Sequence, residues 1–362
     1  MKLRKLFLGA GVVAAIATGL GAQAVQAVQA APARPLAAAP PTINVQSCAG
    51  GSFCLLTGDK PGHGFNPFIE EWTGKAWRII PKPSGYTGTV TCGGPSFCLA
   101  LTSQPKKPSR YVLWNGKAWR KFSPQPPDQG IECLSPTFCA AADQSFGSDG
   151  VAWNGKTWQQ MPGGSGCGGA WCAYGNFGCA SATDCWSSGD YCGDSDCDNG
   201  TFFWNDIWNG TTWIPGANMS GVGDDEACTG RSFCLSLDPP KATTTRDWFT
   251  TTQDASAGLA NACRHLASCA LPTRPACGSP HFCLALPSQD PSASLAWNGT
   301  KWRVVRLALI GGHLPKLTNL DCGSPANCMA TGTYQLTPRG TPRPVAEHWN
   351  GKAWAVTSIA KV

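Results

Sequence analysis

The sequence has little charge and, beyond its first 35 residues, no long apolar run. Asp, Glu, Lys and Arg make up 14% of the 362 residues, whereas Gly (43) and Pro (29) are abundant. Without a long apolar run, no later segment is expected to span a membrane. The abundance of turn-forming residues instead favours many short strands, in one large all-β domain or in two average domains.

Motifs of known catalytic chemistry are also missing. The chain has no Gly-x-Ser-x-Gly elbow, no His-Glu-x-x-His and no phosphate-binding loop. Glu70 and Glu71 are neighbours in a strand-like segment, so they are expected on opposite faces and not as an acid–base pair. The five histidines are scattered, and we interpret them as surface or turn residues: His63, His265, His281, His313 and His348.

The N-terminus has the features of an export signal. Lys2, Arg4 and Lys5 precede the apolar run Leu6–Leu20, and three small-residue steps resembling cleavage sites follow. This pattern predicts a signal peptide over residues 1–30 and a secreted, extracellular protein; an uncleaved anchor is the alternative. Residues 31–41 are a Pro/Ala-rich stretch that we interpret as a linker.

The mature chain has a weak net charge. The first 33 residues hold three of the 28 basic residues, which leaves 25 basic against 22 acidic residues, or about +3. No basic face is concentrated in the sequence, so we expect no nucleic-acid partner. An exported chain with twenty cysteines is instead expected to form disulfides.

Fourteen of the cysteines form a repeat of two cysteines separated by five residues. The first members of successive pairs lie 41 to 49 residues apart. The pairs are Cys48 with Cys54, Cys92 with Cys98, Cys133 with Cys139, Cys179 with Cys185, Cys228 with Cys234, Cys277 with Cys283, and Cys322 with Cys328. Each pair is predicted to be a disulfide across the hairpin between the first two strands of a repeat. The alternative is that the cysteines bind zinc. A structural zinc site usually needs two cysteine pairs close together, and seven pairs spread around a ring would not converge in this way.

Each pair except the fifth is followed by two tryptophans around a glycine turn. These are Trp72 with Trp77, Trp114 with Trp119, Trp153 with Trp158, Trp208 with Trp213, Trp297 with Trp302, and Trp349 with Trp354. Asn-Gly predicts a two-residue type I′ turn, which would place Trp114 opposite Lys117 and diagonal to Trp119. In the fifth repeat, Trp248 takes the place of the first tryptophan and Gln253 that of the second. The pairs could stack on sugar rings, but regular recurrence favours packing between repeats.

A repeat of this length, rich in turns and β-formers, predicts a seven-bladed β-propeller over residues 42–362, all-β, with four-stranded antiparallel blades. The first strand comes from residues 42–47 and the last carries Trp354. Ring closure is therefore expected to depend on packing between the first and last blades, with no exchanged strand.

Alternation of strand direction divides such a ring into two faces. The cysteine hairpins and the tryptophan turns lie at one face, and the loops between the second and third strands, with the blade connections, lie at the other. The loops vary widely in length: Gly58–Pro67, Ser103–Arg110, Ser187–Thr201 and Gly332–Pro344. Function usually lies in loops held by a rigid scaffold, so we expect binding there.

The fourth repeat carries two extra cysteine pairs, Cys167 with Cys172 and Cys192 with Cys197, and the fifth carries Cys263 with Cys269. Around the second of these pairs, Asp194, Asp196 and Asp198 alternate before a glycine, which is a pattern that can ligate calcium. A solvated acidic loop is the alternative, and no other cofactor is expected. The segment from Asp196 to Phe203 is also similar to the Asp-box turn of sialidase-type propellers, with Asp196 in place of the usual Ser.

The repeat resembles those of secreted β-propeller proteins of actinobacteria, and more distantly kelch and sialidase-type propellers. The resemblance is carried by Ser52-Phe53-Cys54 and Trp72-Thr-Gly-Lys-Ala-Trp77 and covers residues 48–354. It implies a propeller fold and export, and brings no catalytic residues. We therefore expect a non-catalytic binding or scaffold propeller, monomeric, recognising a glycan or a protein. The alternatives are a glycan-active enzyme, sialidase-like hydrolase or polysaccharide lyase, and a purely structural envelope protein.

Overall fold

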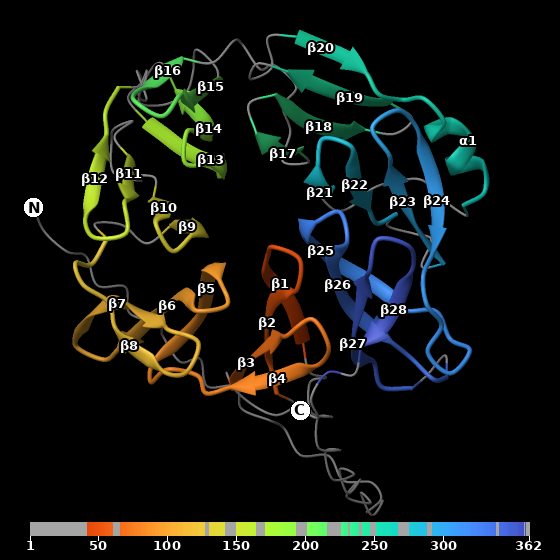
Figure 1. Cartoon of the computed structure of the whole chain (residues 1–362), viewed down its shortest axis with the longest axis horizontal. Helices are drawn as coiled ribbons and strands as arrows, with labels where there is room; N and C mark the ends of the chain where they lie inside the picture. The colour runs from red at the N-terminus through yellow and green to blue at the C-terminus, as the bar shows by residue number, and fades with distance from the viewer. Residues whose placement is uncertain are drawn as a thin grey trace, which may run out of the picture. The chain divides into compact units, whose positions relative to one another are not determined.

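The computed structural model shows a seven-bladed β-propeller (Figure 1). It describes residues 42–60, 66–126, 130–141, 150–163, 171–192, 201–215, 226–230, 232–238, 241–246, 251–266, 275–287, 292–337, 340–357 and 359. Each blade is a four-stranded antiparallel sheet built from four consecutive strands. The fold and the strand order predicted from the repeats are confirmed. The predicted signal peptide and linker lie outside the described residues.

The first four blades extend from Thr42 to Pro215. Blade 1 contains β1 (Thr42–Ala49), β2 (Phe53–Asp59), β3 (Pro67–Trp72) and β4 (Trp77–Ile80); blade 2 contains β5 (Tyr86–Gly94), β6 (Phe97–Gln104), β7 (Lys107–Trp114) and β8 (Trp119–Lys121). Blade 3 contains β9 (Ile131–Ser135), β10 (Phe138–Ala141), β11 (Gly150–Trp153) and β12 (Trp158–Met161); blade 4 contains β13 (Trp171–Ser181), β14 (Asp184–Cys192), β15 (Thr201–Trp208) and β16 (Trp213–Pro215).

The last three blades extend from Glu226 to Thr357, and blade 5 is followed by a short helix. Blade 5 contains β17 (Glu226–Gly230), β18 (Phe233–Asp238), β19 (Lys241–Arg246) and β20 (Thr251–Asp254), followed by α1 (Leu259–Arg264); blade 6 contains β21 (Ala276–Ser279), β22 (Phe282–Ala285), β23 (Ala293–Trp297) and β24 (Trp302–Arg306). Blade 7 contains β25 (Lys316–Ser324), β26 (Asn327–Tyr334), β27 (Arg343–Trp349) and β28 (Trp354–Thr357).

A disulfide closes the hairpin between the first two strands of every blade, as the sequence predicts. The two half-cystines of each bridge are direct partners across the hairpin, with Cα atoms 3.9 to 4.0 Å apart. In blade order, the bridges join Cys48 to Cys54, Cys92 to Cys98, Cys133 to Cys139, Cys179 to Cys185, Cys228 to Cys234, Cys277 to Cys283, and Cys322 to Cys328. Among the residues described, no cysteine is free.

All fourteen of these cysteines are therefore structural, and the alternative that they ligate zinc is not supported. The second member of each pair lies on the second strand of its blade and faces the first tryptophan position on the third strand. Cys139 faces Trp153, Cys185 faces Trp208, Cys283 faces Trp297, and Cys328 faces Trp349. Each of these four cysteines is fully buried, so the bridge and the indole ring form one packed layer of the blade.

The turn between the two tryptophans differs from the predicted type I′ hairpin. Trp114 lies directly opposite Trp119, so the loop has four residues and not two. Gly116 has a φ of 84°, but Asn115 has no positive φ. The Asn115 Oδ1 instead accepts hydrogen bonds from the backbone N–H groups of Lys117 (3.0 Å) and Ala118 (2.9 Å). The asparagine is therefore a side-chain cap of the loop, a role that Asn fulfils readily in turns.

The tryptophans pack within and between blades, as the recurrence predicts. Ring centroids within each pair lie 5.5 to 5.8 Å apart. In three blades the first indole N–H donates to a carbonyl of its own cysteine hairpin, for example from Trp349 to Pro325 O (3.0 Å). In five blades the second indole N–H donates to the preceding blade, for example from Trp158 to Pro124 O (3.2 Å).

Blade 5 departs from the predicted alignment. Cys234 faces Thr245, and Thr245 faces Thr252, so two threonines hold the places of the tryptophan pair. The prediction that Trp248 and Gln253 hold these places is wrong, because Cys234 pairs with Thr245, three residues before Trp248, and the ladder continues one pair further to Arg246 and Thr251. Trp248 itself lies outside the described residues.

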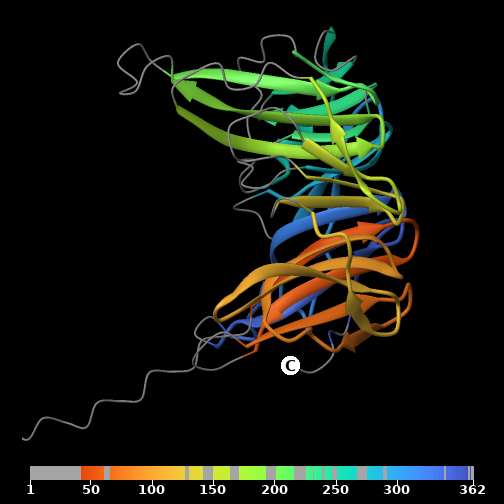
Figure 2. The ribbon, with the colours of Figure 1, turned by 90° about the vertical axis from the view of Figure 1, so that its left-hand side faces the viewer.

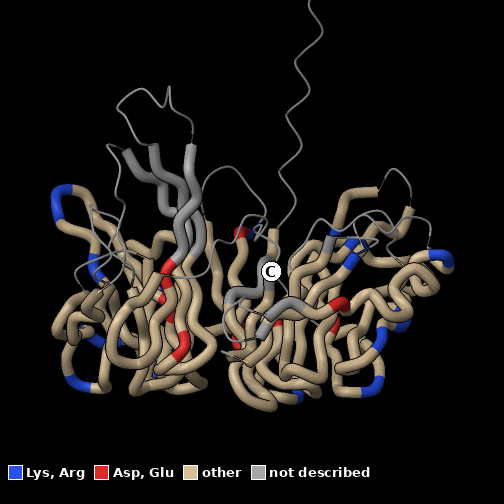
Figure 3. The backbone as a smooth tube through the Cα atoms, turned by 90° about the horizontal axis from the view of Figure 1, so that it is seen from above, with Lys and Arg blue, Asp and Glu red and all other residues tan. Residues whose placement is uncertain are grey.

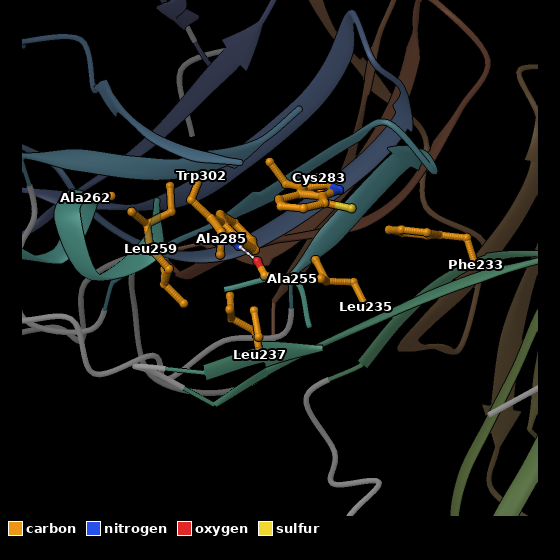
Figure 4. Packing of buried hydrophobic residues seen from close by; sticks show 12 residues of the cluster. Phe233, Leu235, Leu237, Ala255, Leu259, Ala262, Cys283, Ala285 and Trp302 are labelled. Carbon is orange, nitrogen blue, oxygen red and sulfur yellow. Dashed lines mark hydrogen bonds between the residues drawn. The ribbon is translucent and has the colours of Figure 1, made fainter. Parts of the chain in front are cut away.

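Helix α1 supplies apolar volume between blades 5 and 6 (Figure 4). Leu259 and Ala262 are buried and pack in one cluster with Leu237 and Trp302. The Trp302 indole N–H donates to Ala255 O (2.9 Å), just before the helix. The insertion thus covers a blade whose own tryptophan pair is missing.

Blades 1 and 7 close the ring by packing and hydrogen bonds, without an exchanged strand. The Trp77 indole N–H donates to Thr357 Oγ1 (2.8 Å), and the Asn327 side-chain amide donates to Gly50 O (3.1 Å). Each of the two blades keeps all four of its own strands. The predicted mode of closure is confirmed.

Candidate functional site

The two faces of the ring differ as the alternation of strands predicts. All seven cysteine hairpins and the tryptophan turns lie at one face, here called the turn face. The loops that join the second and third strands, with the blade connections, lie at the other, here called the variable-loop face. Strands β14 and β15 extend beyond the strands of the neighbouring blades on one side of the ring (Figure 2).

The larger described hollow runs along the outer edge of blade 2, from the loop of β6 and β7 at the variable-loop face to Trp119 beside the tryptophan turn. This groove, here called the blade-2 groove, has a volume of about 1080 Å³. Its lining residues come from the loop of β6 and β7, from strand β8 and from the connections before and after the blade. They are Pro83, Ser84, Thr102, Gln104, Lys107, Pro108, Ser109, Arg110, Tyr111, Val112, Trp119, Arg120, Lys121, Phe122, Ser123 and Gln125.

The groove forms because strand β8 is short. It pairs only with Val112–Trp114, so the first part of β7 has no strand partner on its outer side. Gln125 takes the next position along this edge. Its Oε1 accepts from the Tyr111 backbone N–H (2.7 Å) and its Nε2 donates to Tyr111 O (3.1 Å). The side chain of Gln125 therefore ends the sheet and fixes one wall of the groove.

The groove is lined by four basic residues and no acidic residue. Arg110, Arg120 and Lys121 are exposed, and none forms an ion pair or a side-chain hydrogen bond within the described chain. The fourth, Lys107, donates from Nζ to Gln104 Oε1 (3.0 Å). In an edge view of the ring, Lys and Arg positions lie on loops and hairpins at both faces (Figure 3). An exposed group of like charges attracts anions, with a strength that depends on salt.

A second, smaller hollow lies at the variable-loop face of blade 7. Its volume is about 480 Å³, and its wall includes the start of the predicted variable loop Gly332–Pro344. The lining residues are His313, Leu314, Lys316, Thr333, Tyr334, Gln335, Thr337 and Pro342. It also contains no Asp or Glu, so neither of these two hollows assembles a pair of carboxylates for glycoside hydrolysis.

The centre of the ring is held by side chains that cap backbone groups of the innermost strands. An innermost strand has one edge without a strand partner, so its N–H groups need other acceptors. In three places the acceptor is the side chain just before the first cysteine of a neighbouring blade. The bonds run from Cys133 N to Thr91 Oγ1 (2.9 Å), from Cys179 N to Glu132 Oε2 (3.1 Å) and from Cys48 N to Asp321 Oδ2 (2.5 Å).

Two of these capping residues are carboxylic acids with altered acidity. Burial, together with the charge of Asp321, raises the pKa of Glu132 to about 7, against a smaller lowering by the Cys179 N–H. Burial likewise raises the pKa of Asp321 to about 6. Perturbed carboxyl groups occur at functional sites and also in structural networks. Here the hydrogen bonds to neighbouring inner strands support a structural role.

A third acid, Glu347, is fully buried and caps a blade connection. Its Oε2 accepts from the Ala308 backbone N–H (3.1 Å), and burial raises its pKa to about 7. Glu70 has the equivalent place in blade 1, two residues before the first tryptophan, and is fully buried. Its neighbour Glu71 instead pairs with Arg78 (2.5 Å). The two glutamates therefore have different surroundings, as expected for adjacent strand residues.

The predicted metal ligands Asp194, Asp196 and Asp198 lie outside the described residues. Within the described part of the chain, no group of three His, Cys, Asp or Glu side chains is placed to hold a metal ion. The calcium site therefore stays a prediction. Among the described residues, no helix is long and apolar enough to cross a membrane.

The predicted variable loop Ser103–Arg110 does line the blade-2 groove, whereas the contributions of Trp119, Arg120 and Lys121 were not predicted. These three residues belong to the strand after the glycine turn, which sequence reasoning treated as framework. A signal was present, because the second tryptophan is followed directly by two basic residues.

Comparisons with known proteins show the fold. No family model and no curated protein matches the chain. Among solved structures, YCF48 bound to a D1 peptide is 12% identical, covering 86% of this chain and 95% of that one with a TM-score of 0.50. YCF48 from Cyanidioschyzon merolae is 10% identical, covering 85% and 98%, with a TM-score of 0.47. A six-bladed fucose lectin of Aleuria aurantia is 9% identical, covering 89% and 95%, with a TM-score of 0.36.

Proposed function

We propose that the mature chain is a secreted, monomeric binding or scaffold propeller that acts without catalysis and recognises a glycan or a protein at its variable-loop face. The observation that carries this proposal is the placement of the hollows. Both described hollows are lined by loop residues of that face, and loops on a rigid scaffold are where binding residues usually occur.

The cysteine hairpins and tryptophan pairs have structural roles, which leaves the variable-loop face for binding. Ten of the twelve paired tryptophans are buried, so their rings are not free to stack on a ligand. Seven disulfides and the caps of the inner strands hold the blades in place. Disulfides on this scale are typical of an oxidising compartment, in agreement with the proposed export and with kinship to secreted actinobacterial propellers.

A glycan array with the mature protein tests the proposal. Two single variants at the variable-loop face, Arg110→Ala and Tyr334→Ala, are compared with Lys117→Ala and Lys352→Ala at the turn face. We expect at least one variable-loop variant to lose a bound ligand and both turn-face variants to keep it. Loss only in the turn-face variants would contradict the proposal, and release of shortened glycan products would favour the enzyme alternative.

A further inference from the structure

We propose that the blade-2 groove binds an acidic polysaccharide, whose carboxylate or sulfate groups contact Arg110 and Lys121. This inference rests on the proposed function and adds the chemical class of the ligand. At about 1080 Å³, the groove is as large as the upper range of ligand pockets, roughly 300–1,000 Å³. It can therefore take more than one sugar unit.

The charges of the groove lie close together without compensation. Lys121 is opposite Val112, two residues along β7 from Arg110, so these two side chains are diagonal neighbours on one face of the sheet. Like charges at this separation repel each other. Neither has a carboxylate partner among the described residues, so a bound anion would relieve the repulsion. Arginine also forms bidentate hydrogen bonds with carboxylate and sulfate-like groups.

The remaining polar groups of the groove suit sugar hydroxyls. Ser84, Ser109 and Ser123 contribute hydroxyl groups beside the basic residues. Trp119 is half-buried at the groove and keeps part of its ring accessible. Hydroxyl groups between fixed charges match a polymer that alternates hydroxyls with acidic groups.

An extended acidic peptide fits this edge less well. Peptides that add to a sheet are held by main-chain hydrogen bonds to an open strand edge. Here Pro108 has no N–H to donate, and Gln125 already binds the outer N–H and C=O of Tyr111. A Pro and a Lys on an outer strand are typical devices that prevent strand addition. Recognition must then depend on side chains.

Binding of oligogalacturonate and heparin oligosaccharides, measured by calorimetry, tests the inference. Neutral dextran oligosaccharides and poly-L-glutamate serve as comparison ligands. The double variant Arg110→Ala/Lys121→Ala is compared with Lys117→Ala/Lys352→Ala, which removes the same charge from exposed turn-face positions. All four side chains are exposed, so both variants are expected to fold, as near-UV circular dichroism verifies.

We expect binding to at least one acidic oligosaccharide that weakens with salt and that the groove variant reduces about fivefold to tenfold. The control variant should change it less than twofold. Equal loss in both variants, or tighter binding of poly-L-glutamate, would overturn the inference. If only neutral glycans bind, and the loss follows variable-loop variants, the inference fails while the proposed function stands. If no ligand depends on that face, both fail.

Discussion

At the scale of single residues, the tryptophans and asparagines of the repeat are framework. Trp114 is 2% exposed and packs against Trp119 and the core between blades 1 and 2. Replacing a buried tryptophan with alanine removes this packing and leaves a cavity. We expect Trp114→Ala to lower the free energy of unfolding by about 3–5 kcal/mol.

Urea unfolding measures this loss, and ligand binding per folded molecule should stay unchanged. Lys117→Ala, an exposed change in the same turn, is the matched control with little effect. Loss of binding by well-folded Trp114→Ala protein would show that the tryptophan belongs to the binding site.

The asparagine cap gives a second prediction at this scale. Asn115→Gly removes the Oδ1 that accepts from Lys117 and Ala118, and should destabilise the protein by about 1 kcal/mol. Asn115→Asp keeps an acceptor, so thermal unfolding should show a smaller loss of stability for this variant than for Asn115→Gly. A type I′ turn would behave in the opposite way, because glycine would then be favoured at this position.

The sequence predicted which of these residues pack but not how they are paired. The Trp-x-Gly-x-x-Trp spacing indicated an aromatic pair, yet the two-residue turn assumed for Asn-Gly shifted Trp114 away from its partner. The error has a physical cause: an Asn side chain can satisfy the turn without a positive φ at its own position. Local residue preference does not distinguish these two solutions.

At the scale of elements, the cysteine hairpin is a local staple. The bridge between Cys92 and Cys98 closes a short loop, so the chain-entropy contribution is only about 2 kcal/mol. We expect the double variant Cys92→Ala/Cys98→Ala to fold, with a free energy of unfolding, measured by chemical denaturation, that is lower by that amount. Complete loss of folding would mean that one bridge supports more than its own blade.

Blade 5 shows why element boundaries were harder to predict than element identity. The cysteine pair and β-rich segments predicted the blade correctly. The alignment followed Trp248, although Thr245 and Thr252 occupy the paired positions. Strand β19 pairs with β18 closer to Cys234 than in the other blades, and the sequence spacing between cysteine and tryptophan does not indicate that shift.

At the scale of the whole ring, the inner strands depend on half-buried acids, which predicts a pH dependence. The pKa of Glu132 is raised by burial to about 7 and that of Asp321 to about 6, so the folded ring retains protons that the unfolded chain releases. The contribution of these two protonated acids to stability is complete below about pH 4, the pKa that they have in the unfolded chain. It is lost as the pH rises to about 7 and the acids ionise in the folded protein. The protein should therefore be more stable at pH 5 than at pH 8.

Thermal unfolding across this range measures the effect. Glu132→Gln keeps an acceptor for the Cys179 N–H but cannot ionise, so its melting temperature should fall less between pH 5 and pH 8 than that of the unchanged protein. Glu71→Gln is a matched control that alters an acid outside the ring centre. A steeper fall for Glu132→Gln would contradict the assignment.

The ring as a whole also shows the limit of sequence reasoning about the site. The variable loop Ser103–Arg110 was predicted to be at the binding face, and it lines the larger hollow. Arg120 and Lys121 join it from a different strand, and Pro83 and Gln125 from the two blade connections. Their proximity depends on where β8 ends, which is a property of the three-dimensional sheet.

The central claim is that ligands bind at the variable-loop face while the cysteine hairpins and the buried tryptophans hold that face in place. Hydrogen–deuterium exchange of the mature protein, with and without a saturating glycan identified on the array, tests it most directly. The account predicts slower exchange in residues 103–110 or 332–337 and no change in the turn Asn115–Ala118. Protection confined to the tryptophan turns and cysteine hairpins would contradict it.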